Sequence, residues 1–217
     1  MNLAIFDLDN TLIAGDSDHA WGEFLVKHGL VDAIAYKAEN DRFYADYCAG
    51  RLDVIAYNEF VFSFLAKHEL SWLQTLHQQF MTEVIKPLML AKAQALIDTH
   101  RQADDRLLII TATNRFITEP IGHAFGINEL LATEPECING RYTGKVEDVP
   151  CYKEGKIVRF QAWLAQQTSV FERTYFYSDS HNDLPLLQYV SNPIAVNPDT
   201  TLLAYAQQQA WPVMDLR

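Results

Sequence analysis

Cysteine is scarce in this sequence and follows no recognisable pattern. Among 217 residues there are three, Cys48, Cys137 and Cys151, without a Cys-x-x-Cys or Cys/His spacing. Disulfide frameworks and structural zinc sites depend on such patterns, and an odd number leaves at least one thiol unpaired. We therefore expect reduced, packed cysteines in a cytoplasmic protein.

Positive charge and long apolar runs are also in short supply. Lys and Arg number 17 against 28 Asp and Glu, which gives a formal net charge of −11. Nucleic acids and anionic membranes attract clustered Lys and Arg, so we expect neither as a partner. No apolar run approaches the ~18 residues of a membrane span. The first strand pattern begins almost at Met1, so we expect no signal peptide.

Apolar residues make up 49% of the chain and are arranged in short runs and helical stripes. Short runs that end at turns are typical of buried strands in a parallel sheet, whereas apolar spacings of three and four indicate helices. Strand-like runs lie at residues 3–6, 107–110, 174–177 and 194–196. The pattern predicts an α/β fold, a Rossmann-like parallel sheet flanked by helices, with a helical cap inserted after the first strand.

The same patterns divide the chain into two expected parts. Helical spacing fills the sequence from the end of the first strand-like run to about Pro87. We therefore expect residues 1–14 and 88–217 to form a Rossmann-like core and residues 15–87 a helical cap domain. A length of 217 residues suits a core domain with a sizeable insertion.

Two acidic side chains, Asp7 and Asp9, follow the first strand-like run. In open α/β sheets ligands lie beyond the carboxyl ends of the strands, so both are expected at that edge. Like charges this close raise each other's pKa unless a cation neutralises them. The pair therefore implies either a shared proton or a hard cation such as Mg²⁺, and we favour the cation. A solvated turn is the alternative, because Asp-x-Asp often occurs by chance.

Polar residues also mark the ends of later elements. Thr111 follows the second run, Asp179 and Asp183 follow the third, and Lys156 lies at the start of a helix. Parallel strands bring their carboxyl ends to one crevice, whatever their distance in sequence. Carboxylates, a hydroxyl and an ammonium group there supply the nucleophile, acid/base, metal ligands and phosphate donors of phosphoryl transfer.

The order Asp-x-Asp-x-Thr, strand-terminal Thr, Lys and Asp-x-x-x-Asp resembles the haloacid dehalogenase superfamily of phosphohydrolases over the whole chain. A helical insertion directly after the first motif is similar to the phosphoserine phosphatase branch, and residues 179–186 resemble that branch's fourth motif. Tyr177 and Ser178 depart from the pattern, which usually has an apolar residue and a glycine before the aspartate.

The resemblance implies roles for the acidic residues. Asp7 would be the nucleophile that forms an aspartyl-phosphate. Asp9 would protonate the leaving alcohol and later deprotonate the attacking water. Mg²⁺ would be held by Asp7, the backbone carbonyl of Asp9 and Asp179, and Asp183 would order its waters.

The remaining motif residues would contact the phosphate or the substrate. Thr111 would donate to a phosphate oxygen, and Lys156 would offset charge on the phosphate and on Asp7. Lys153 is the rival lysine; Lys156 is favoured because its sequence continues into the helix as the family's lysine does. Asn114 and Asn182 are candidate substrate contacts, although each also suits a local cap or turn.

Substrate choice is expected to depend on the cap. Asp16 falls where the phosphoserine phosphatases that the chain resembles place an acidic residue for the substrate amine, and it equally suits a helix N-cap. A substrate carboxylate is best bound by arginine, and residues 52–100 contain none. The expected substrate is a small amine-bearing phosphorylated metabolite of the histidinol phosphate or phosphoserine type. The missing arginine favours a phosphorylated amino alcohol such as histidinol phosphate.

Three alternatives use the same motifs. A phosphotransferase would pass the phosphoryl group from the same intermediate to an alcohol, and a non-catalytic module would bind phosphate and Mg²⁺ without turnover. A dehalogenase is disfavoured because it needs neither the acid nor the metal. We expect a monomer or a homodimer.

Overall fold

The computed structural model describes residues 1–217, and at its centre is a seven-stranded sheet in the order β4-β3-β2-β1-β5-β6-β7. All neighbouring strands are parallel except β3 and β4. The strands are β1 (Leu3–Phe6), β2 (Arg106–Asn114), β3 (Leu130–Ile138), β4 (Arg141–Glu147), β5 (Thr174–Ser178), β6 (Asn192–Val196) and β7 (Val213–Met214). The predicted α/β fold is confirmed.

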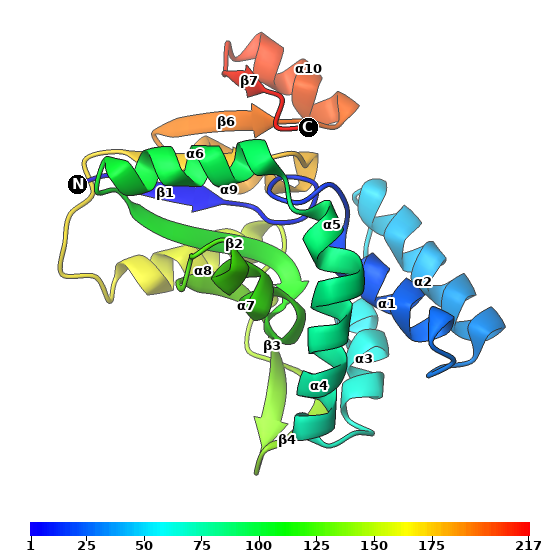
Figure 1. Ribbon diagram of the computed structural model, residues 1–217. Coiled ribbons are helices and arrows are strands. Elements are labelled where there is room, and N and C mark those ends of the chain that lie inside the picture. Colours follow the sequence, from blue (N-terminus) through cyan, green and yellow to red (C-terminus); the bar gives the residue numbers. More distant parts are fainter.

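Helices cover both faces of the sheet and form the insertion after β1 (Figure 1). Those after the insertion are α6 (Ala91–Gln102), α7 (Arg115–Ala124), α8 (Glu154–Leu164), the 3₁₀ turn η2 (His181–Asp183), α9 (Leu184–Tyr189) and α10 (Thr200–Gln208). In β1, Ala4 and Phe6 share a core cluster with α6 and α7, whereas Leu3 and Ile5 pack with α8, α9 and α10. This alternation is what a strand buried on both faces requires.

The insertion between β1 and β2 is helical throughout. It contains α1 (Ser17–Lys27), α2 (Ala33–Cys48), α3 (Val54–Leu65), α4 (Leu70–Phe80), the π-helical turn η1 (Met81–Ile85) and α5 (Lys86–Leu88). Its aromatic core surrounds Trp21, which is fully buried, and is continuous with the cluster on the α6 and α7 face of the sheet. The insertion therefore lies at the carboxyl ends of the strands, packed against one face of the core (Figure 1).

The two connections to the insertion run side by side. Ile13 forms an antiparallel bridge with Met89, and the Ala14 amide donates to the Leu88 carbonyl at 2.8 Å. Chain exit and chain return are thus held together by backbone hydrogen bonds. We propose that this pair is the boundary between a core of residues 1–14 and 88–217 and a cap of residues 15–87.

A β-hairpin extends the sheet beside the insertion. β3 and β4 pair antiparallel across Asn139 and Gly140, whose φ angles are 52° and 77°. Two positive φ angles are those of the primed turn that an Asn-Gly pair favours. β4 packs against α3, so this hairpin contacts the insertion as well as the core.

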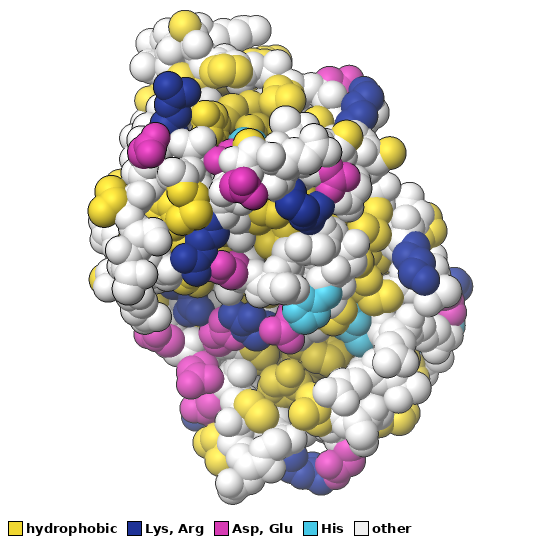
Figure 2. Space-filling view, turned by 60° about the vertical axis from the view of Figure 1, so that its left-hand side comes forward, with side chains coloured by type: hydrophobic (Ala, Val, Ile, Leu, Met, Phe, Trp, Pro, Cys, Tyr) yellow, Lys and Arg dark blue, Asp and Glu magenta, His cyan; other side chains and the backbone are white.

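Charge on the surface is mixed. On the face in Figure 2, Lys and Arg side chains lie singly or in small groups beside Asp and Glu and do not gather into one patch. No helix of the chain combines the length and apolar character needed to cross a bilayer.

Candidate active site

Asp7 continues the hydrogen-bond ladder of β1 and presents its carboxylate at the end of the sheet. Its backbone amide donates to the Tyr177 carbonyl at 2.9 Å. The Thr11 hydroxyl lies 3.3 Å from Asp7 Oδ2 and 3.2 Å from Asp179 Oδ1. These two carboxylate oxygens are therefore separated by no more than two hydrogen-bond lengths, which brings the first and last motifs to one point.

Lys156 lies between two of the aspartates. Its Nζ is 2.8 Å from Asp7 Oδ1 and 2.7 Å from Asp183 Oδ1, and the residue is 2% exposed. Gly155, the residue before it, lets the start of α8 lie against Pro150, because a Cβ there would lie 2.0 Å from the Pro150 carbonyl oxygen. The rival Lys153 points elsewhere and donates to the Gly50 carbonyl at 2.6 Å.

Ser178, which departs from the family pattern, holds Asp183 in place. Its hydroxyl donates to Asp183 Oδ2 at 2.7 Å and accepts from the Ser180 amide at 3.2 Å. Asp183 is thus fixed by Ser178 on one side and Lys156 on the other. The serine adds a hydrogen bond that glycine lacks.

Asp9 is turned toward β2 and α1. Its Oδ1 accepts from the Ser17 amide at 2.6 Å, and its Oδ2 accepts from the Thr113 hydroxyl at 2.8 Å, with the Thr111 hydroxyl at 3.5 Å. Pairing of β2 with β3 is irregular between Ile110 and Asn114, where both threonines lie. Thr113 was missed by the sequence analysis; its signal was the i, i+2 spacing from Thr111, which places both on one face of a strand.

Negative charge greatly exceeds positive charge here. Burial raises the pKa of Asp7 to about 7 despite Lys156, and it raises the pKa of Asp9 to about 7 as well. Burial followed by the charges of Asp7 and Asp183 raises the pKa of Asp179 well above its ordinary value. Lys156 is the single buried basic side chain among these carboxylates. Additional cations are needed to keep the carboxylates ionised.

The oxygen donors at this end of the sheet fit a hard divalent cation. Asp7 and Asp179 each have a carboxylate oxygen within hydrogen-bond distance of the Thr11 hydroxyl, so the two oxygens lie near each other. Carboxylate oxygens are ligands that Mg²⁺ prefers. One other group, His19, Glu23 and Asp41, has its possible ligand atoms within 4.8 Å of one another. It lies on the insertion surface, where Lys37 already pairs with both carboxylates.

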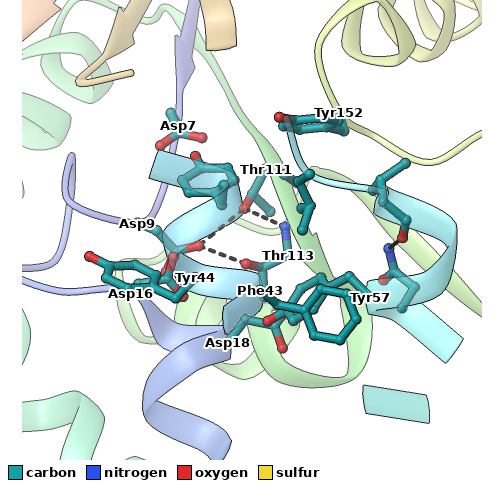
Figure 3. Close-up of a pocket in the computed structure, with 15 residues that line it drawn as sticks. Asp7, Asp9, Asp16, Asp18, Phe43, Tyr44, Tyr57, Thr111, Thr113 and Tyr152 are labelled. Carbon is teal, nitrogen blue, oxygen red and sulfur yellow. Dashed lines mark hydrogen bonds between the residues drawn. The ribbon is translucent and has the colours of Figure 1, made fainter. Parts of the chain in front are cut away.

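The insertion contributes acidic and aromatic side chains to the pocket above Asp7 and Asp9. Asp16 and Asp18 line it, together with Phe43, Tyr44 and Tyr57 (Figure 3). Asp16 is also the N-cap of α1 and accepts from the His19 amide at 2.8 Å, so the expected N-cap is present in a residue that lines the pocket. No Lys or Arg lines this pocket.

Asp18 was missed by the sequence analysis. An acidic residue in the first turn of a helix is usually solvated and favoured by the helix dipole. Asp18 is instead 4% exposed. Its signal was the i, i+3, i+7 spacing with Trp21 and Leu25, which places it on the buried face of α1.

The two asparagines have structural partners. Asn114 is the N-cap of α7, accepts from the Ile117 amide at 3.2 Å and donates to Asp18 at 3.4 Å. Asn182 donates to the Tyr47 carbonyl and accepts from the Tyr152 hydroxyl, both at 3.2 Å. Asn114 therefore positions Asp18, and Asn182 joins the core to the end of α2; neither lines the pocket.

The pocket has little free space. Its free volume of about 30 Å³ is enough for about two water molecules. A substrate larger than phosphate enters only when the insertion or its side chains move, which is the usual behaviour of a lid over a reaction site.

Comparisons with known proteins agree with this geometry. A model of the family described as haloacid dehalogenase-like hydrolase matches residues 4–188. A histidinol-phosphatase from Neisseria meningitidis serogroup C (strain 8013) is 47% identical over 220 residues, 100% of this chain and 99% of that protein.

Solved structures show the same fold. A protein of unknown function from Bordetella pertussis Tohama I is 42% identical with a TM-score of 0.94, covering 100% of this chain and 99% of that one. A phosphoserine phosphatase structure, described as a phospho-aspartyl intermediate analogue, has a TM-score of 0.70 at 15% identity, covering 100% of this chain and 93% of that one. Because the family model spans most of the sequence and a relative matches from end to end, this chain belongs to the haloacid dehalogenase-like hydrolase family, as a phosphatase.

Proposed function

We propose that this phosphatase hydrolyses the phosphate monoester of a small amine-bearing alcohol, of the histidinol phosphate type, through an aspartyl-phosphate on Asp7. The observation that carries the proposal is the pocket next to Asp7 and Asp9, which presents Asp16 and Asp18 and no basic side chain. An ammonium group on the substrate matches that lining. The relative that is 47% identical is a histidinol-phosphatase, which supports the same substrate type.

The chemistry divides into two displacements at phosphorus. A carboxylate oxygen of Asp7 forms a bond to phosphorus while the ester P–O bond breaks, and the departing alkoxide takes a proton from Asp9. A water then attacks the phosphorus and gives a proton to Asp9, and the bond to Asp7 breaks. Inorganic phosphate leaves, and both carboxyl groups return to their starting states.

A raised pKa suits Asp9 to both steps. A group with a pKa of about 7 is present in both protonation states near neutral pH, so it can donate a proton and then accept one. Its hydrogen bonds from the Ser17 amide and the Thr113 hydroxyl hold the carboxyl group between α1 and β2. Thr111, whose hydroxyl lies 3.5 Å from Asp9 Oδ2, would donate to a phosphate oxygen.

Asp7, the Asp9 carbonyl and Asp179 would hold Mg²⁺. When bound, the metal would offset the repulsion between the phosphate and the carboxylates and polarise the phosphoryl group. Lys156 contributes a second positive charge from the chain itself. Asp183 holds that lysine against Asp7.

The lining also argues against a substrate carboxylate. Phosphoserine carries a carboxylate beside its amine. Such a group needs a basic partner that offsets the cost of removing it from water. The pocket is lined by acidic, aromatic, aliphatic, hydroxyl and amide side chains and by no Lys or Arg. We therefore expect histidinol phosphate to be a better substrate than phosphoserine.

The experiment is a measurement of inorganic phosphate release from both compounds and from 4-nitrophenyl phosphate, with and without Mg²⁺. We expect Mg²⁺-dependent release, with kcat/KM highest for histidinol phosphate. Asp7→Asn should abolish release from all three. Asp104→Asn is the matched control, because Asp104 is exposed and distant from the pocket, and it should keep full activity.

Two results would contradict the proposal. Release that persists in Asp7→Asn would exclude this residue as the nucleophile. A higher kcat/KM for phosphoserine than for histidinol phosphate would exclude the substrate assignment and leave the phosphatase chemistry standing.

A further inference from the structure

Asp18 is a buried carboxylate whose neighbours leave its charge unbalanced. The Asn114 amide donates to it at 3.4 Å, and the Tyr57 hydroxyl faces it. Both groups are neutral. Burial, followed by the charges of Asp16 and Asp9, raises the pKa of Asp18 well above its ordinary value.

An apolar side chain would suit this position better if folding were the only requirement. Asp18 lies on the face of α1 that carries Trp21 and Leu25, and both of these are fully buried. Isolated buried carboxylates are destabilising unless a cation pairs with them. The lining of the pocket includes no Lys or Arg, so a cation that pairs with the ionised form of Asp18 would come from a bound molecule.

Asp18 and Asp16 serve different parts of the pocket. In Figure 3, Asp7 and Asp18 lie toward opposite ends, and Asp9 and Asp16 lie between them. Beside Asp18 are the rings of Phe43 and Tyr57, whose centroids are 5.2 Å apart. Aromatic side chains next to a carboxylate make a favourable site for a flat cation.

From this geometry we infer that Asp18 is a specificity-determining residue that binds a second basic nitrogen of the leaving group, carried on a ring and separate from the amine at Asp16. The inference rests on the proposed function and deepens it. A single ammonium group at Asp16 would leave Asp18 without a cationic partner. The substrate therefore carries one basic group near the phosphate and another at the far end of the molecule.

The test compares two substrates that differ only in the ring. Histidinol phosphate carries an imidazole, and phenylalaninol phosphate carries a phenyl ring on the same amino alcohol. In the wild-type protein kcat/KM should be higher for the imidazole compound. In Asp18→Asn the ratio of the two kcat/KM values should fall about 10- to 100-fold, because one charge-assisted contact is lost, and the change should appear mainly in KM.

Asp16→Asn is the matched comparison. It removes the same charge at the amine that both compounds share, so their kcat/KM values should fall together and their ratio should change less than threefold, an order-of-magnitude expectation for a shared contact. Tyr57→Phe is the second variant in case Asp18→Asn does not fold. It should lower the ratio in the same direction, because it removes the hydroxyl that faces Asp18.

The outcomes separate this inference from the proposed function. Equal losses for both compounds in Asp18→Asn, or an unchanged ratio, would assign Asp18 a structural role and overturn the inference. A wild-type protein that hydrolyses both compounds without preferring the imidazole would also overturn it while leaving the phosphatase proposal intact. Absence of hydrolysis of any phosphate ester would instead refute the proposed function.

Discussion

The candidate site has two ends, named here after the proposed chemistry, and they are built differently. At the phosphate end, formed by Thr11, Asp7, Lys156, Asp183 and Ser178, each polar side chain contacts another at 2.7–3.3 Å. At the leaving-group end, formed by Asp16, Asp18, Phe43, Tyr44 and Tyr57, two carboxylates face aromatic rings. The first end is prearranged for one chemical step. The second end lacks the positive charge that would complete it.

This difference separates catalysis from recognition. A saturated network holds its members rigidly, so a substitution there should affect all substrates alike. Where the charge of a site is balanced only by the ligand, a substitution should affect each substrate according to the groups that the substrate carries. Substitutions at the two ends test whether one affects all substrates alike and the other affects them selectively.

The largest effect is expected from Lys156→Met. Removing this ammonium group leaves Asp7 and Asp183 buried without their shared cation, which costs about 3–5 kcal/mol of unfolding free energy. We expect kcat to fall about 10²- to 10³-fold for every substrate. Urea unfolding and phosphate release measure the two effects.

Lys153→Met is the control for that prediction. Lys153 lies three residues away and contacts the Gly50 carbonyl, so its loss should lower kcat by less than about tenfold, the scale of one surface-accessible hydrogen bond. Equal losses in the two variants would show that the phosphate end is not the rigid unit described here.

The joint between the insertion and the core should be sensitive to acid. His77 of α4 donates from Nε2 to the Ile117 carbonyl of α7 at 2.9 Å, and burial lowers the pKa of His77 from 6.5 to about 4. Below pH 6.5 the unfolded chain binds the proton more strongly than the folded chain. The stabilisation is therefore complete above pH 6.5 and is lost progressively as the pH falls to about 4, by about 3 kcal/mol.

His77→Gln isolates this effect, because glutamine can donate to the same carbonyl without titrating. The unfolding free energy should fall more steeply between pH 6.5 and 4 in the wild type than in the variant, as measured by chemical denaturation at several pH values. Parallel curves would show that His77 is not neutral in the folded protein.

At the leaving-group end, Asp16→Asn should act on substrates selectively. Asparagine is as good an N-cap as aspartate, so α1 should keep its first turn while the charge is removed. The ratio of kcat/KM for histidinol phosphate to that for 4-nitrophenyl phosphate should fall about 10- to 100-fold. A uniform loss for both compounds would contradict a role in amine binding.

The smallest effect is expected from Ser178→Ala. The variant removes one hydrogen bond to the Asp183 carboxylate, a loss of about 1–2 kcal/mol that corresponds to roughly a tenfold lower kcat for all substrates. Steady-state kinetics with the amine-bearing compound and the aryl phosphate tests whether the loss is uniform. A loss confined to one compound would place Ser178 outside the phosphate end.

Much of this organisation follows from strand periodicity. Short apolar runs identified β1, β2, β5 and β6, and the convergence of parallel strands predicted that Asp7 and Asp179 would meet. The turn at Asn139 and Gly140 has the positive φ angles that an Asn-Gly pair favours. These features depend on local pattern and on a topological rule that holds across α/β proteins.

The remaining features depend on how helices pack across the chain. Asn114 was a candidate substrate contact, and only the placement of α7 against α1 shows that it caps one helix and contacts Asp18 on the other. Asn182 likewise contacts α2, 135 residues earlier in the chain. Sequence pattern defines the face of each helix but not which helix lies opposite it.

The turn between β5 and α9 contacts the candidate active site through some of its residues and the insertion through others. Asp179 and Asp183 face Thr11 and Lys156, whereas Asn182 holds α2 and His181 lies where a Cβ on Gly50 would approach its Nε2 to 2.7 Å. A substitution in this turn would disturb chemistry and lid contact at once. Diversification toward new metabolites is therefore expected in α1, α2 and α3, where a changed side chain alters what is recognised and leaves the machinery of hydrolysis intact.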